Sequence, residues 1–231
     1  MADQDTLKGF RAAALRVGVT GAVRVAPLGT ELPQFGEKYN TEVFHNVGYL
    51  SPDGVAVSFD EDANEYVPWQ EAVAIRRDIT KSVTSVQITL WDFGKRNAEM
   101  FFGSEAVTEA DGTWHVDVSG KPEFERQMVV IDVVDGDKAM KLILPVAQIT
   151  AREGVTFKSD EAVALGITFT AYPASAEEYP NIPELEGKSA RWYFSDTWDG
   201  TGASSTTTSG EVTEDTTRGN TRPAENTDQA A

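Results

Sequence analysis

The sequence contains no cysteine and few groups suited to catalysis. Without cysteine, its 231 residues cannot form a disulfide framework, a thiolate metal site or a cysteine nucleophile. His45 and His115 are the only histidines, and the chain has no Gly-x-Ser-x-Gly motif and no glycine-rich phosphate loop. Two carboxylates could serve a glycosidase, but among thirty-seven acids no particular pair stands out. We therefore expect a protein that is not an enzyme and has no cofactor.

Positive charge is also scarce. Lys and Arg total 20 against 37 Asp and Glu, which gives a net charge of -17. Stable binding to nucleic acid or to an anionic membrane needs a basic face, so this composition argues against both. No apolar run reaches the roughly 18 to 20 residues of a membrane-spanning helix. The first residues carry acids and no apolar core, so we expect no signal peptide.

The ordered part of the chain is patterned mainly as β-strands. Residues 83–91 alternate, with Val86, Ile88 and Leu90 on the expected core face. Asp-Gly pairs at 111–112 and 135–136 supply the positive φ of tight hairpin turns. The further expected strands are residues 55–59, 72–79, 106–108, 114–118, 127–134, 138–144, 147–152 and 164–172. Strands at this spacing predict a β-sandwich or barrel.

One short helix and two terminal segments complete the expected organisation. Residues 94–103 have helical spacing over about two turns, and Gly103 is a natural stop. Residues 1–20 are expected to form an N-terminal arm and residues 21–198 the folded domain. From residue 199 to 231 the chain is acidic, rich in Ser and Thr and without aromatics, which predicts a disordered C-terminal tail.

A long segment between residues 27 and 49 has no strand alternation but is rich in aromatic side chains. Loops above roughly 12 to 15 residues are usually functional or disordered, and the aromatic content argues against disorder. Such a loop must pack on something. Its own sheet and a neighbouring subunit are equally good candidates.

One acidic segment partly matches the pattern of a calcium-binding loop. Asp60, Asp62 and Asn64 copy the opening of a calcium-binding loop, and Glu71 falls at its twelfth position. The sixth position is Glu65, where the sharp turn requires Gly. Pro68 interrupts the loop as well. We therefore favour a solvated acidic turn and expect no metal site.

Several segments together resemble a known family. They are residues 21–33, the Gly-Tyr-Leu-Ser-Pro-Asp-Gly run within 47–57, the strand within 78–91 and residues 165–173. In their order along the chain and in their amino-acid sequences, these segments resemble the major tail proteins, or tail tube subunits, of long-tailed phages with non-contractile tails, especially those of actinobacteria. The resemblance covers roughly residues 10 to 175 and carries no catalytic signature.

The resemblance implies a tail-tube-type β-sandwich with one short flanking helix and a long interface loop. It implies stacked, hexameric rings that polymerise around a tape measure protein, bounded by tail terminator and distal tail proteins. The resulting tail tube lies in the virion and conducts double-stranded DNA to the host without binding it specifically, after synthesis of the subunits in the host cytoplasm. The loop maps to residues 30–46, so the implied interface residues are Leu32, Pro33, Phe35, Tyr39 and Phe44.

Two other functions stay open on the sequence alone. A surface β-sandwich binding module would use the Ser/Thr-rich tail as a stalk, although its long internal aromatic loop would then be unexplained. A carboxylate-dependent enzyme has only the number of acids in its favour.

Overall fold

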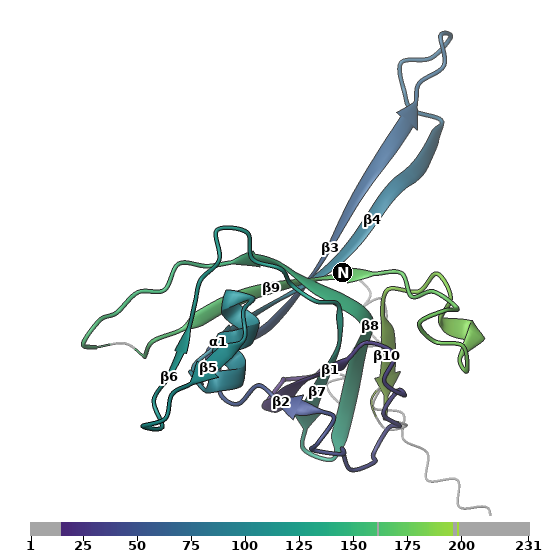
Figure 1. Cartoon of the computed structure of the whole chain (residues 1–231). Coiled ribbons are helices and arrows are strands. Elements are labelled where there is room, and N and C mark those ends of the chain that lie inside the picture. The colour runs from purple at the N-terminus through teal and green to yellow at the C-terminus, as the bar shows by residue number, and fades with distance from the viewer. Residues whose placement is uncertain (1–14, 161, 196–197, 199–231) are drawn as a thin grey trace, which may run out of the picture.

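The computed structural model describes residues 15–160, 162–195 and 198. The predicted tail, 199–231, and most of the predicted N-terminal arm lie outside the described residues. Residues 15–19 have no regular structure, and the first strand begins at Thr20. The described part is mainly antiparallel β-structure with one α-helix, as the sequence predicted (Figure 1).

Antiparallel pairing links most of the strands in the described chain into one sheet. Its order is β2-β1-β7-β8-β9-β4-β3, with β10 pairing to β8. The bounds are β1 Thr20–Pro27, β2 His45–Asn46, β3 Leu50–Tyr66, β4 Arg76–Leu90, β7 Gln127–Asp135, β8 Lys138–Arg152, β9 Leu165–Tyr172 and β10 Arg191–Phe194. A separate small hairpin joins β5, Ala106–Thr108, to β6, Trp114–Val116. A short 3-10 helix, η3, covers Pro183–Leu185.

The sheet curls around its main core. Val23 of β1 and Val86 of β4 come from strands far apart in the sheet order, yet they belong to one buried cluster. β8 makes the curl possible, because its first part pairs with β7 and its last part with β9. Phe101 of the helix α1, Lys95–Phe102, joins the same cluster from the side. The arrangement is the sandwich-like architecture that the strand spacing indicated.

A second core lies on the opposite face of β7 and β8. Along β7, Val129 and Ile131 point into the main core while Met128 and Val130 point into the second. Because both faces are covered there, the stretch from Met128 to Ile131 is apolar without interruption instead of alternating. The second cover comes from the loop after β1 and from the segment that contains η3, through Leu32, Phe44, Tyr179 and Leu185.

Local sequence signals account for most of the boundaries. Gly103 ends α1 with a left-handed φ of 68°, and a side chain there would meet the ring of Phe124 at 2.9 Å. Gly112 and Gly136 occupy the expected hairpin turns with positive φ. Two predictions need correction: residues 72–75 lie in a loop, and the expected break between 144 and 147 is absent because β8 continues through Pro145.

Candidate assembly surface

The most prominent feature of the molecule is a long hairpin that leaves the body. β3 and β4 pair continuously from Val55 opposite Ile88 to Tyr66 opposite Arg76, with one register shift on the way. β9 supports β4 only between Thr84 and Leu90. Beyond Thr84 the hairpin is a two-stranded ribbon that extends away from the rest of the chain (Figure 1). We name residues 60–83 the projecting hairpin and residues 67–77 its tip.

The projecting hairpin exposes large apolar side chains that a monomer would normally cover. Trp69, at the tip, is 98% exposed. Five more large apolar residues of this segment are more than half exposed, namely Tyr66, Val67, Val73, Ile75 and Ile79. Contiguous exposed apolar surface marks an interaction site in a folded protein. An isolated two-stranded hairpin is only marginally stable in water, so this segment gains stability when another surface covers it.

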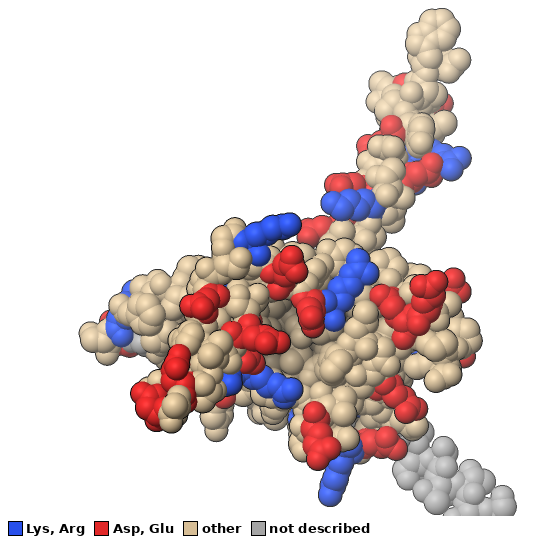
Figure 2. All heavy atoms as spheres, viewed as in Figure 1, with Lys and Arg blue, Asp and Glu red and all other residues tan. Residues whose placement is uncertain are grey.

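Charges of both signs line the part of the hairpin between the body and the tip, which we call its shaft (residues 60–66 and 78–83). The far end is uncharged over most of its surface (Figure 2). Arg76 pairs with Asp78 at 2.8 Å, and Lys81 lies 4.0 Å from Asp62. Arg77 is exposed, and the described residues offer it no ion pair. An apolar tip beside an arginine is the composition of a protein contact, since aromatic residues and Arg are enriched at interfaces.

The residues that match part of a calcium-binding loop lie in this hairpin. Asp60, Asp62 and Asn64 belong to strand β3, paired with β4, and Glu71 lies in the tip. The expected acidic turn is therefore an extended strand, because pairing with β4 continues through it. An extended strand does not wrap its side chains around one ion as a calcium loop does. In the part of the chain that the structure describes, no group of three or more acidic, His or Cys side chains could hold a metal ion.

The aromatic loop after β1 packs on its own sheet. Leu32 is 9% exposed and Phe44 8%, both inside the second core. Tyr39 is half-buried and meets Phe44 edge-on, with ring centroids 5.2 Å apart. Pro33 is half-buried, and Phe35 is 37% exposed beside Tyr193. Of the five predicted interface residues, Phe35 therefore keeps the most surface for another chain.

A charged cluster fixes this loop to the sheet. Asp132 of β7 accepts hydrogen bonds from Arg24 Nη1 at 2.7 Å and from the Tyr39 hydroxyl at 2.6 Å. Lys141, only 3% exposed, lies 4.0 Å from Asp132 and donates to the backbone carbonyl of Gln34 at 2.7 Å. Burial and the Asp132 hydrogen bond raise the pKa of Tyr39, and burial lowers the pKa of Lys141. The loop is thus tied to the body through polar as well as apolar contacts.

The two histidines occupy unrelated surroundings. His115 Nδ1 lies 3.3 Å from a carboxylate oxygen of Glu109 in the β5–β6 hairpin, where both side chains are exposed. His45 lies on β2, and burial together with the charge of Arg96 lowers its pKa.

Among the described residues, no helix has both the length and the apolar content needed to cross a bilayer.

The architecture defines a class, a mainly antiparallel β protein with one short α-helix and a projecting hairpin. The family model described as "Phage tail tube protein" matches residues 8–197. The chain belongs to the phage tail tube protein family. It is therefore a structural protein of the virion, with its place in the tail tube. No curated protein matches the chain significantly.

Three solved structures of tail and tube assemblies show weak likenesses to the chain. The tail of an empty GTA particle, refined with C6 symmetry, has 11% identity and a TM-score of 0.38, covering 72% of this chain and 96% of that one. The PVC sheath-tube complex of an extracellular contractile injection system has 10% identity and a TM-score of 0.37, covering 74% and 95%. A native GTA virion chain has 14% identity and a TM-score of 0.35, covering 62% and 96%. The family assignment rests on the family match alone.

Proposed function

We propose that copies of this chain polymerise into stacked hexameric rings that form the wall of the tail tube, the conduit for genome delivery. The projecting hairpin carries the proposal, because it extends beyond the body and exposes Trp69 and other apolar side chains. Covering each large apolar side chain contributes about 1.5 to 3 kcal/mol, so several of them supply a substantial driving force for assembly.

The loop after β1 has a divided role in this proposal. Leu32, Tyr39 and Phe44 hold the loop on its own sheet and so shape the surface presented to neighbours. Phe35 and Pro33 face outward more and contact an adjacent subunit. Interface anchors contribute most when they are aromatic and fully covered by the partner.

A tail tube also implies other partners, at its two ends and inside its lumen. A tape measure protein occupies the lumen during assembly, and tail terminator and distal tail proteins bound the two ends. Double-stranded DNA passes through without being held, because a net charge of -17 per chain repels phosphate. The non-enzymatic role fits the same picture, since a tube wall needs contacts and a lumen instead of a reaction centre.

Electron microscopy of the purified full-length protein tests the proposal. At rising protein concentration, negatively stained samples should show rings that stack into tubes with a central lumen. Averages viewed down the axis should have six-fold symmetry. Compact monomers at every concentration and salt condition would overturn the tube role, and another symmetry would overturn only the hexameric ring.

A further inference from the structure

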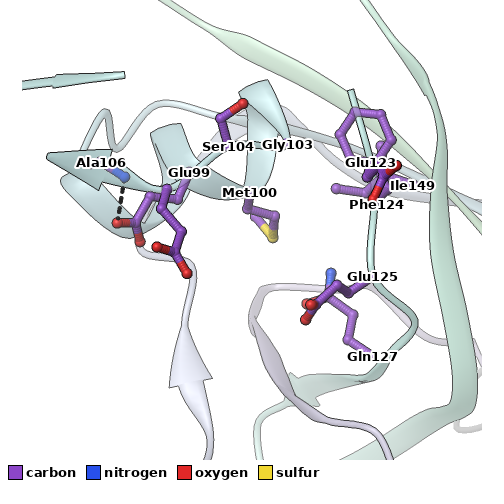
Figure 3. A pocket seen from close by; sticks show the side chains of 11 residues that line it. Glu99, Met100, Gly103, Ser104, Ala106, Glu123, Phe124, Glu125, Gln127 and Ile149 are labelled. Carbon is purple, nitrogen blue, oxygen red and sulfur yellow. Dashed lines mark hydrogen bonds between the residues drawn. The ribbon is translucent and has the colours of Figure 1, made fainter. Parts of the chain in front are cut away.

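A cavity of about 460 Å³ opens beside α1, on a different part of the molecule from the projecting hairpin. Its walls are the end of α1 with the following turn, and the segment 123–127 that leads into β7. Met100 projects into the space from the helix, and Glu125 points into it from the opposite side (Figure 3). Pockets that receive a large side chain or a small molecule are of this size.

The cavity combines an apolar lining with a negative rim. Met100, Phe124 and Ile149 supply the apolar part. No Lys or Arg lines the cavity, whereas four glutamates do, namely Glu99, Glu105, Glu123 and Glu125. Acidic and basic side chains both lie on the surface around α1, β5 and β6, since α1 itself begins with Lys95 and Arg96 (Figure 2). Arg126 and Arg152 lie close by, but the side chains that line the cavity itself carry only negative charge. Carboxylates that line a concave site attract a cationic side chain of a partner.

The hairpin tip has the complementary composition. Trp69 is a large apolar side chain with almost no contact of its own, and Val73 and Ile75 flank it. Arg77 follows at the base of the tip and is exposed. An indole that fills an apolar cavity, with an arginine reaching the acidic rim, is the kind of contact that dominates binding energy at interfaces.

The tip cannot reach the cavity of its own chain. From Thr84 to Arg76 the chain takes eight residue steps as a paired ribbon, which advances about 26 Å from the last strand that supports it. Pairing in a continuous register keeps this ribbon extended, so the tip lies away from α1 (Figure 1). The receiving cavity must therefore belong to a second copy of the chain.

We infer that the hairpin tip of one copy docks into the α1 cavity of another, with Trp69 on Met100 and Phe124 and with Arg77 facing the glutamate rim. This inference rests on the proposed function and names the receiving surface for the hairpin. Tip and cavity are different surfaces of one chain, so the contact is head-to-tail. Such contacts build rings or open filaments, because a copy that docks its tip still offers its own cavity to the next copy.

Engineered cysteines test the docking directly, because the natural chain has none. The full-length Gln70→Cys variant carries a thiol on the tip, and the Ser104→Cys variant carries one on the cavity wall. A mixture of the two, assembled and mildly oxidised, should give a disulfide-linked dimer that either variant alone gives far less of. A disulfide requires Cα atoms within about 7 Å, so it reports close docking. Asn181→Cys, exposed on the η3 segment, replaces Ser104→Cys as the control.

The outcomes separate this inference from the proposed function. Tubes with the linked dimer support both. Tubes without it, or with equal linking to the Asn181→Cys control, overturn the docking and leave the tube role standing. Absence of rings and tubes from wild-type samples overturns the tube role and, with it, the docking that rests on it.

Charge reversal tests the glutamate rim. Arg77→Glu should lower the yield of the linked dimer at least about fivefold, because like charges then face each other at the docked tip. Adding Glu123→Lys and Glu125→Lys to the cavity partner should restore it. Lys81→Glu changes the net charge equally but lies on the hairpin shaft, so it should leave the yield within about twofold. Equal losses from the two hairpin variants, or no restoration, would overturn the proposed electrostatic contact.

Discussion

The hydroxyl of Tyr39 donates a 2.6 Å hydrogen bond to Oδ2 of Asp132, a residue 93 positions further along the chain. The same carboxylate oxygen accepts from Arg24 at 2.7 Å, and the guanidinium of Arg24 lies 4.1 Å from the centre of the Tyr39 ring. One residue of the loop is thereby joined to both β1 and β7. The contact explains why a long segment without regular structure keeps a fixed position on the sheet.

Tyr39→Phe removes this hydrogen bond and keeps the ring. Because the acceptor is a partly buried carboxylate, we expect the free energy of unfolding to fall by about 1 to 2 kcal/mol. Urea denaturation of the full-length protein measures the change. Tyr49→Phe is the control, since Tyr49 is mostly exposed and should change stability by less than about 0.5 kcal/mol. Equal stability of the Tyr39→Phe variant and wild type would show that the bond does not hold the loop.

Tyr179 should make stability depend on alkaline pH. Its hydroxyl donates to the carbonyl of Pro145 at 2.7 Å, and burial raises its pKa from 10.0 to about 12. The stabilisation is complete below pH 10, where the phenol is protonated in both states. Above pH 10 the unfolded chain loses its proton first, so stability falls as the pH rises toward 12.

Denaturation midpoints between about pH 9 and pH 11 check this expectation. Wild type should lose stability across the interval, and Tyr179→Phe should lose less because it has no proton to release there. The pKa of Tyr39 is raised as well, so the stability of the Tyr179→Phe variant should still fall somewhat with rising pH. A steeper decline in Tyr179→Phe than in wild type would refute the assignment.

Two phenylalanines of the loop should respond differently to truncation. Phe44 is buried against Tyr39, and Phe44→Ala should lower the free energy of unfolding by about 3 to 4 kcal/mol. Phe35 is partly exposed, and Phe35→Ala should cost less than about 1 kcal/mol while weakening assembly. Thermal melts measure the first effect, and light scattering of assembling protein measures the second. Normal assembly of Phe35→Ala would place that side chain outside the subunit contacts.

Salt should promote assembly. Each chain carries -17, so chains that approach one another repel. Raising ionic strength from 0.01 M to 0.15 M shortens the screening length from about 30 Å to about 8 Å, which weakens this long-range repulsion. A covered local contact such as that proposed for Arg77 is screened much less. Light scattering should therefore rise faster at the higher salt concentration, and slower assembly on adding salt would contradict the account.

The body of the fold could be predicted because its signals are local. Val86, Ile88 and Leu90 alternate with polar residues, and the buried cluster contains all three. Gly112 and Gly136 marked hairpin turns through the conformations that only glycine adopts easily. The continuity of β8 through Pro145 was missed, since a proline inside a strand usually indicates its end.

The projecting hairpin was missed for a physical reason. From Asp60 to Tyr66, strand β3 has no buried face, so no alternation of apolar and polar residues is required there. Its pairing with β4 defines it, and that pairing is a non-local contact. The exposure of Trp69 could not be predicted either, because a sequence does not distinguish an aromatic residue that fills a core from one exposed to a partner. Its position beside Pro68, between two strand-forming segments, was the available signal.

The most direct test of the account compares tube formation by Trp69→Ala with that by Phe157→Ala. Both residues are large exposed aromatics, but Phe157 lies between β8 and β9, outside the projecting hairpin. Electron micrographs of matched samples should show tubes from wild type and Phe157→Ala and at least about tenfold fewer from Trp69→Ala, because an exposed aromatic anchor is lost at every contact. All three proteins should melt at similar temperatures. Wild-type numbers of tubes from Trp69→Ala would contradict the claim that the hairpin tip joins the subunits.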